Sequence, residues 1–424
     1  MNPVASWPAS IFSDDDTASP AETLLRQNPG MFKPWTDPAS GVTSYILTKR
    51  VAPFQQSFYY VNPSLSDDGR YFWFYCAFPP AGSANQGRSL GVADLKTGTV
   101  HHYPETEFTD ASPVVDTATG TAYWCTGLEV WKRRPEPGAQ AKLVNRFPAA
   151  LARNRRPWRL ATHLTFSADR KALNLDVEIG TEWFIGHLPL DGGPFELWQR
   201  LERCYNHAQF NPVDPSLQLI AQDHSVHPVS GEVTPYENRI WLIRRGEAAA
   251  PLFPSPQAIP PHVAGGNPHF ETQTHYTITD ERAKQGHEWW GSDGQHVWYI
   301  AYGQGVKRVK PISKGDPKAE LIWPHPSISH AHANSLETQL VCDSLPPDDP
   351  SDRRVSFFDL PTRKQINIVS HMPELNNDLR RYHVHPHPQF CLQDRLICYT
   401  TTVLDRVDVA FTPLSALRSA LLRA

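Results

Sequence analysis

A turn followed by a dense apolar strand recurs seven times along this chain of 424 residues, and no other feature constrains the fold as strongly. The repeats include SDDGRYFWFYCAF, GSDGQHVWYIAY and LQDRLICYTTT. They begin at Ser66, Asp116, Ser167, Asn211, Gly291, Ser335 and Leu392. Successive starts lie roughly 44–57 residues apart, with one larger gap after Asn211. That period is typical of the four-stranded blade of a β-propeller.

A second strand-and-turn unit follows each of these strands, as in SLGVADLKTGTVHHYP and RVSFFDLPTRKQINIV. Two hairpins per period make one four-stranded blade, so seven periods predict an all-β, seven-bladed propeller. The last repeat ends before a fourth strand. We therefore expect an N-terminal strand at Val42–Arg50 to close the ring by pairing with the C-terminal blade. Two sandwich domains are the alternative.

The expected domain organisation is simple. Residues 1–40 are polar and lack the repeat, so we expect an extended N-terminal arm lying on the ring. Residues 41–424 form the single propeller domain. Within it, residues 255–286 are rich in Pro, Gly and His, which predicts a long functional or mobile loop.

Composition excludes several classes of function. A net charge of -4, without a basic stripe between aromatics, argues against a nucleic-acid partner. No apolar run approaches the ~20 residues that cross a bilayer, so no membrane partner is expected. The six cysteines show no CxxC spacing, which is typical of free thiols in a reducing compartment. The first residues lack the pattern of a signal peptide, so we expect a soluble cytoplasmic protein. The oligomeric state leaves no signal.

Five histidines stand at similar places ahead of the repeated strands. They are His163, His207, His287, His332 and His387. The innermost strand of a propeller blade lines the central channel, so these imidazoles are expected around one mouth of it. Imidazole is a common metal ligand and general base. The alternative is that each histidine only hydrogen-bonds the next blade.

The densest histidine segment is YHVHPH, residues 382–387. In an extended segment, alternation sends His383, His385 and His387 to one face. An H-x-H pair with one further histidine makes a plausible three-nitrogen metal site, and His332 of the preceding blade is the expected third ligand. The alternative is an exposed His/Pro loop that binds nothing.

At these motifs the chain resembles the oligogalacturonate lyases, polysaccharide lyase family 22. The resemblance rests on HPHP at residues 385–388 with Phe390, on HEWW at 287–290 before a Ser-Asp-Gly turn, on RIWL from Arg239, and on Ala331-His332. It implies a seven-bladed propeller with a manganese site that cleaves oligogalacturonate by β-elimination.

The resemblance also implies roles for individual residues. His332, His385 and His387 would be ligands of a divalent metal, Mn²⁺, with His287 the catalytic base and Arg239 its cationic partner at the substrate. Tyr382 takes the position of the family's ligand glutamine, where water or His383 are alternative ligands. The segment between Arg239 and His287 is longer than in the family.

These residue types suit the elimination of a uronate, because a cation, a permanently charged arginine and a neutral imidazole can together remove a weakly acidic proton beside a carboxylate. An anionic oligosaccharide is the expected partner. We expect its binding residues to be His207, His163, Trp289 and His383. Blade core is the alternative for one of Trp289 and Trp290, and a salt bridge with Glu237 is the alternative for Arg239.

Two other classes of function remain open at this stage. One is a non-catalytic propeller that binds a sugar or a protein partner and keeps a relict metal site. The other is a metal-dependent hydrolase or isomerase acting on another acidic sugar. No GxSxG elbow and no phosphate-binding glycine loop occurs, which excludes a propeller-linked serine hydrolase and a P-loop enzyme.

Overall fold

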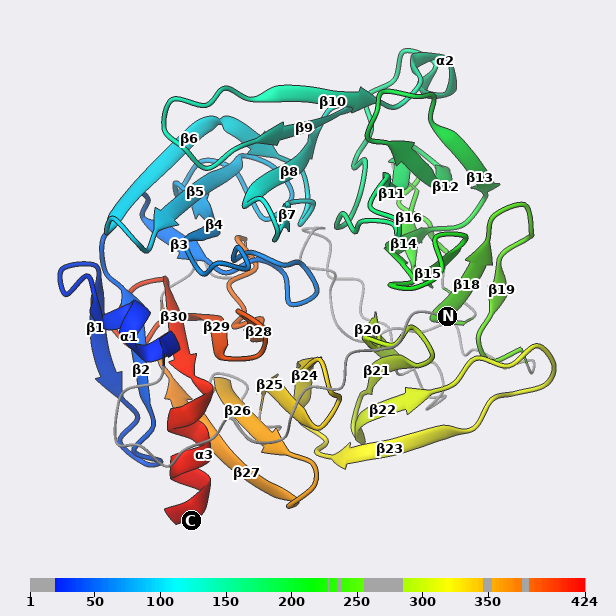
Figure 1. Cartoon of the computed structure of the whole chain (residues 1–424). Helices are drawn as coiled ribbons and strands as arrows, with labels where there is room; N and C mark the ends of the chain where they lie inside the picture. The colour runs from blue at the N-terminus through cyan, green and yellow to red at the C-terminus, as the bar shows by residue number, and fades with distance from the viewer. Residues whose placement is uncertain are drawn as a thin grey trace, which may run out of the picture.

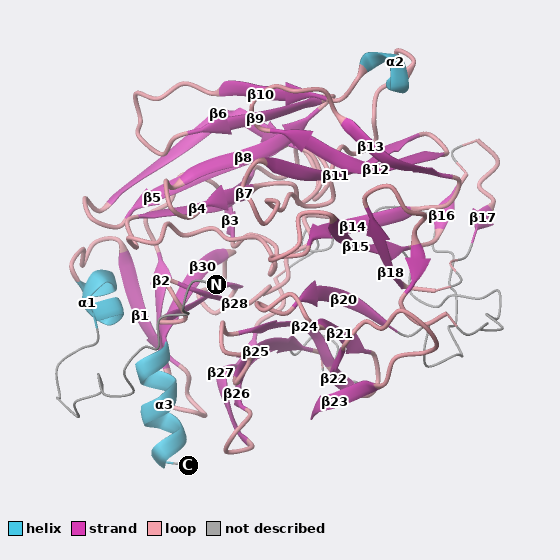
Figure 2. Cartoon of the chain, turned by 45° about the vertical axis from the view of Figure 1, so that its right-hand side comes forward, coloured by secondary structure: helices cyan, strands magenta, loops and turns pink. Residues whose placement is uncertain are grey.

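The structure is a computed structural model that describes residues 20–227, 229–234, 236, 238–254, 285–345, 353–375 and 381–423. Seven antiparallel sheets follow one another around a ring (Figure 1), which confirms the predicted seven-bladed β-propeller. The described helices lie outside the sheets (Figure 2). None of them has the length and apolarity needed to cross a membrane.

The strands of the first three blades run outwards from the channel in chain order. Blade 1 contains β3 (Phe54–Gln56), β4 (Tyr71–Ala77), β5 (Arg88–Asp94) and β6 (Thr99–Phe108). Blade 2 contains β7 (Val114–Asp116), β8 (Thr121–Thr126), β9 (Glu129–Arg133) and β10 (Lys142–Arg146). Blade 3 contains β11 (Ala172–Ile179), β12 (Glu182–Pro189) and β13 (Glu196–Leu201). An isolated bridge from Phe166 to Leu173 marks the innermost position of blade 3.

Blades 4 to 6 keep the same order, with one added hairpin. Blade 4 contains β14 (Tyr205–Phe210), β15 (Leu217–Gln222), β18 (Ile240–Arg244) and β19 (Ala250–Pro251), and carries the hairpin of β16 (Ser225–Val226) and β17 (Val233–Thr234). Blade 5 contains β20 (Gln285–Trp290), β21 (Val297–Ala301), β22 (Gly305–Val309) and β23 (Ala319–Pro324). Blade 6 contains β24 (Ile328–Ala333), β25 (Gln339–Ser344), β26 (Arg353–Asp359) and β27 (Lys364–Met372).

Blade 7 joins the two ends of the chain. Its sheet has the order β1-β2-β30-β29-β28, formed by β28 (Gln389–Cys391), β29 (Leu396–Thr401), β30 (Asp408–Pro413), β2 (Thr43–Leu47) and β1 (Phe32–Thr36). Tyr45 and Ile46 of β2 pair with Phe411 and Ala410 of β30. The N-terminal strand thus supplies the position that the C-terminal repeat lacks.

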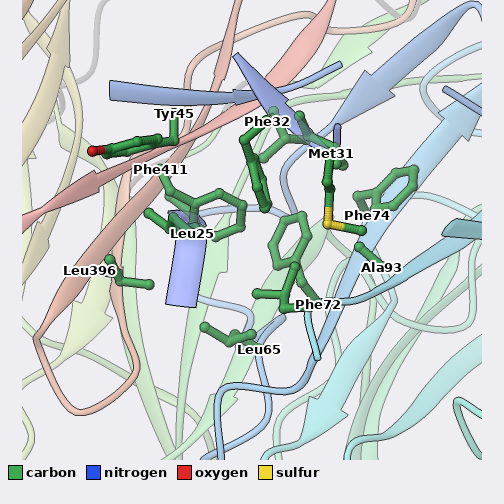
Figure 3. Packing of buried hydrophobic residues seen from close by; sticks show 14 of the residues in the cluster. Leu25, Met31, Phe32, Tyr45, Leu65, Phe72, Phe74, Ala93, Leu396 and Phe411 are labelled. Carbon is green, nitrogen blue, oxygen red and sulfur yellow. The ribbon is translucent and has the colours of Figure 1, made fainter. Parts of the chain in front are cut away.

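The described part of the N-terminal region is more ordered than the extended arm that the sequence predicts. Residues 20–36 contain helix α1 (Pro20–Arg26) and strand β1, and residues 1–19 lie outside the described part. The physical reason is apolar burial. Leu25 and Phe32 pack with Phe72 and Phe411 in a core cluster where blades 7 and 1 meet (Figure 3). Of the predicted loop 255–286, residues 285 and 286 belong to β20 and the others lie outside the described residues.

Two short helices complete the described structure. Helix α2 (Ala149–Ala152) connects blades 2 and 3, and α3 (Leu414–Arg423) follows the last strand. Leu417 and Leu421 of α3 pack with Ile368 and Val369 of blade 6. All six cysteines are free thiols, five of them buried.

Candidate functional site

The first turn of each blade sets a common register. The residue that opens the turn bonds to, or pairs with, the start of the next strand: Ser66 with Tyr71, Asp116 with Thr121, Ser167 with Ala172, Asn211 with Leu217, Gly291 with His296, Asn334 with Gln339 and Cys391 with Leu396. Four positions before these residues stand Asn62, Ser112, His163, His207, His287, His330 and His387. Five of the seven blades therefore present a histidine at one equivalent position.

Blade 6 corrects the sequence prediction. His330, and not His332, occupies the equivalent position, because the turn of this blade opens at Asn334, four residues after His330. His332 instead faces Phe390, whose backbone N–H donates to His332 Nδ1 over 3.0 Å. Burial lowers the pKa of His332 to about 4. We therefore assign His332 to packing between blades 6 and 7.

Tyr59 lies among four of the equivalent histidines. Its ring centroid is 5.0 Å from that of His387, 5.5 Å from His163, 6.0 Å from His207 and 6.1 Å from His330. The ring centroid of Tyr60, the next residue, lies 6.1 Å from that of His287 and 5.4 Å from that of His330. Neither tyrosine was predicted from the sequence, because both follow β3 without a repeated pattern.

Four histidines bring their ring nitrogens together. One ligand atom from each of His330, His383, His385 and His387 lies within 4.8 Å of every other. His330 Nε2, His385 Nδ1 and His387 Nε2 are buried and have no hydrogen-bond partner among the described residues. Buried imidazole nitrogens are normally bonded, so this arrangement fits a divalent cation held by nitrogen ligands. His383 thus joins the cluster, in agreement with its prediction as an alternative ligand and not with its prediction as a substrate-binding residue.

Asp343 orients the cluster from behind. The Nδ1–H of His330 donates to the Asp343 carboxylate, with both oxygens at 2.9 Å, and the backbone N–H of His387 reaches the same carboxylate over 3.2 Å. This contact fixes the His330 tautomer and directs Nε2 towards the other three histidines. A carboxylate behind a histidine ligand is the usual outer support of a metal site.

Backbone strain also aims the imidazoles. His207, His287, His383 and His387 have φ between 43° and 52°, in the left-handed region that few non-glycine residues adopt. His207 and His287 lie within bulges of β14 and β20. Such conformations cost about 1–3 kcal/mol each and concentrate at functional sites.

His287 lies directly beside the four-histidine cluster. Its ring centroid is 3.9 Å from that of His330. Nδ1–H donates to the Ser329 carbonyl, and the Tyr302 hydroxyl lies 3.0 Å from the same nitrogen. Burial first, and then His330, hold the pKa of His287 well below its ordinary value. A neutral ring with Nδ1 protonated leaves the lone pair on Nε2, as a general base requires.

Arg239 is held by two carboxylates. Its Nη2 lies 3.3 Å from Glu288 Oε1, and its Nη1 lies 3.2 Å from Asp223 Oδ2. Glu288 belongs to blade 5, so this is the kind of inter-blade salt bridge left open by the sequence, although with a different partner. Glu237, the expected partner, lies outside the described residues. With two acidic neighbours, Arg239 adds little net positive charge to the site.

Two predicted site residues point away from the cluster. The Tyr382 hydroxyl donates to the Ala81 carbonyl, and its fully buried ring packs edge-on against Phe54. The phenol oxygen is therefore engaged away from the histidines. Trp289 is buried and stacks on Trp298 in the core of blade 5. Their size and apolarity explain both placements.

A cavity of about 390 Å³ opens beside the cluster, within the usual size range of ligand sites. Its walls include Tyr59, His207, Arg239, His287, His383 and His387. His163 is fully buried against Tyr59 and His207, and neither of its ring nitrogens has a partner among the described residues. The cavity therefore joins the proposed base, Arg239 and two of the four clustered histidines, with His163 behind its wall.

Comparison with known proteins places the fold. No family profile and no curated protein matches the sequence. The structure is similar to that of an oligogalacturonate lyase in complex with manganese, with a TM-score of 0.64 and 16% identity over 91% of this chain and 97% of that one. It is also similar to the oligogalacturonate lyase of Vibrio parahaemolyticus, with a TM-score of 0.66 and 15% identity over 90% of this chain and 96% of the other. This chain has the fold of these lyases.

Proposed function

We propose that this protein is a metal-dependent lyase that cleaves short uronate oligosaccharides by β-elimination. One observation carries the proposal: four convergent imidazoles lie next to a neutral His287 at the edge of a cavity. The similarity in fold to oligogalacturonate lyases supports the choice of reaction and substrate.

The donor set fits a divalent cation held by His330, His383, His385 and His387, with Asp343 behind them. When bound, such an ion would neutralise the carboxylate of the uronate and so stabilise the charge that develops on proton removal. We propose Mn²⁺, the metal in one of the two similar lyases. Zinc, nickel and iron also suit imidazole ligands, so elemental analysis must identify the ion.

His287 is the proposed base. Its Nε2 takes the C5 proton of the uronate, the electron pair of that C–H bond forms the C4–C5 double bond, and the C4–O bond breaks with its electrons on the leaving oxygen. The Ser329 carbonyl holds the ring by Nδ1 throughout. A positioned base of this kind contributes about 10²–10⁴-fold to the rate.

Arg239 is proposed to position the site and not to meet the substrate as a free cation. Its pair with Glu288 connects blades 4 and 5 at the residue next to His287, and its pair with Asp223 lies within blade 4. Because Glu288 is also the residue after His287, this buried network fixes the backbone that carries the base.

The test combines elemental analysis with a digalacturonate assay. Turnover is monitored through the ultraviolet absorbance of the unsaturated product. We expect bound metal and absorbance growth in the natural protein. His287→Asn should abolish turnover and keep the metal, whereas His330→Ala should lose both. Bound metal without turnover of any uronate would contradict the lyase and favour a sugar-binding propeller.

A further inference from the structure

Three arginines line the cavity, and one of them differs from the others. Arg239 pairs with Glu288 and Asp223, and Arg159 Nη2 lies 2.7 Å from Glu178 Oε2. Arg88 also lines the cavity, but its hydrogen bonds go to backbone carbonyls, and it forms no salt bridge with a carboxylate among the residues that the structure describes.

The surroundings of Arg88 hold its guanidinium rigidly. Arg88 is only 5% exposed. Nη2 donates to the Ala84 carbonyl over 2.6 Å and to the Asp110 carbonyl over 2.9 Å. The guanidinium carbon lies 4.5 Å from the ring centroid of Tyr75 and 5.2 Å from that of Phe108. Nε is buried and has no partner in the described part of the chain.

A buried cation that forms no salt bridge is costly, although the nearby Asp110 carboxylate offsets part of the cost electrostatically. Burial lowers the pKa of Arg88, but a guanidinium remains protonated near neutral pH. The Asp110 carboxylate shares the cavity, yet it is the backbone carbonyl of Asp110 that accepts from Arg88. An anion entering the cavity would therefore gain an already desolvated and oriented partner, and a carboxylate matches the planar fork of arginine.

We propose that Arg88 binds the carboxylate of a second uronate unit, so that the protein selects substrates of at least two acidic sugars. This inference rests on the proposed function for the identity of the sugar. The metal site would occupy the carboxylate of the unit that is cleaved. Arg88 belongs to β5, across the ring from β20, which carries His287 (Figure 1). A second unit extending across the mouth would therefore approach Arg88.

Trp158 supports an extended site. It lines the same cavity next to Arg159 and remains 41% exposed, which is unusual for so large an apolar side chain. An exposed indole at the rim offers an apolar face to a sugar ring, while Arg88 takes the charge. The lining of this cavity thus provides both contacts that an acidic sugar needs.

The experiment is calorimetric titration of the metal-loaded protein with digalacturonate and with galacturonate, in a His287→Asn background that prevents turnover. Arg88→Gln should weaken digalacturonate binding roughly 10- to 100-fold, because a charged hydrogen-bonded pair is lost. Galacturonate binding should not change. Arg88→Lys keeps the charge but loses the planar fork of the guanidinium, so its loss of digalacturonate affinity should be smaller than that of Arg88→Gln.

Arg133→Gln is the matched control. Arg133 is another buried arginine over an aromatic ring, that of Tyr103, but it pairs with Glu105 away from the cavity. An equal loss in this control, an equal loss for both sugars, no loss with Arg88→Gln, or no digalacturonate binding at all would overturn the inference. A selective loss in a protein that eliminates no uronate would keep the Arg88 site and refute the lyase. Elimination of a uronate with no selective loss in Arg88→Gln would support the lyase and refute the Arg88 site.

Discussion

Blades 3 and 6 carry the same pair of residues and use it differently. His163 and His330 occupy the equivalent position, and the same register places Asp176 and Asp343 opposite them on the next strand. In blade 6, Asp343 accepts from the His330 ring. In blade 3, Asp176 accepts from the backbone and hydroxyl of Thr162, at 2.7 and 2.6 Å.

The consequence for each imidazole is direct. His330 is turned so that Nε2 meets three other histidines, whereas His163 stacks on Tyr59 without a polar partner among the described residues. A histidine at a repeated position therefore does not define its own role. The donor that bonds to the neighbouring carboxylate distinguishes the proposed metal ligand, His330, from the buried packing residue, His163.

The largest expected effect in this comparison comes from His330→Ala. We expect loss of bound metal and a fall in kcat/KM of roughly 10³-fold or more, because the cation can no longer stabilise the developing charge. His163→Ala should leave the metal content unchanged. Elemental analysis of both variants tests the difference, and equal metal loss would refute the separate roles.

Asp343→Asn should act on the same ligand less strongly. An amide can still contact His330 but does not favour the same tautomer, so metal affinity should fall about 10- to 100-fold. Competition with a chelator measures this affinity. Asp176→Asn serves as the control and should leave it unchanged, because Asp176 bonds Thr162.

The pH dependence of stability should show that His163 and Asp176 of blade 3 titrate independently, unlike the bonded pair of blade 6. Burial holds the pKa of His163 at about 3, below the unfolded value of about 6.5. The unfolded state therefore binds the extra proton first. The contribution of His163 to the free energy of unfolding is fully present above pH 6.5. It falls by about 1.4 kcal/mol per pH unit as the pH drops towards 3. His163→Phe should remove this slope.

Asp176→Asn should change the profile in the other direction. Burial raises the pKa of Asp176 to about 7. In the natural protein, the contribution of this carboxyl to the free energy of unfolding therefore decreases as pH rises from about 3.8 to 7. Without it, stability should fall more steeply towards low pH. Urea unfolding at several pH values, with chelator present, measures both slopes. Parallel slopes for the two variants would contradict the assignment.

The smallest effect should come from His332→Phe. Its imidazole accepts only the Phe390 N–H among the contacts found in the described structure, so the expected cost is about 0.5–1.5 kcal/mol of unfolding free energy. Metal content and kcat/KM should stay at the natural level, as elemental analysis and the product assay would show. A metal-free His332→Phe protein would restore the role first expected for this residue.

Much of the fold was predictable from local patterns. Turn residues such as Asp293-Gly294, each followed by an apolar strand, repeat with the length of a blade. His383, His385 and His387 converge as predicted, but through a turn with positive φ at His383 and His387 and not through alternation along an extended segment. The N-terminal helix and β1 were missed because their burial depends on Phe72 and Phe411, which are distant in sequence.

The site was harder to predict, although one signal was available. His330 lies four residues before Asn334, as the other repeated histidines lie before their turns, and the register of that turn pairs it with Asp343. Counting from the turn would have found both residues. The direction of the Tyr382 hydroxyl and the neutralisation of Arg239 by Glu288 depend on packing between blades, which a single sequence does not encode locally.

The pairing of β2 with β30 has a consequence for biosynthesis. Blade 7 contains His383, His385 and His387 from the C-terminal part of the sequence, together with a strand from the N-terminal part, so it forms only after everything between them has been synthesised. We therefore expect the proposed four-histidine metal site to be complete only after β2 has paired with β30. Binding of a cation would then serve as a measure of ring closure during folding.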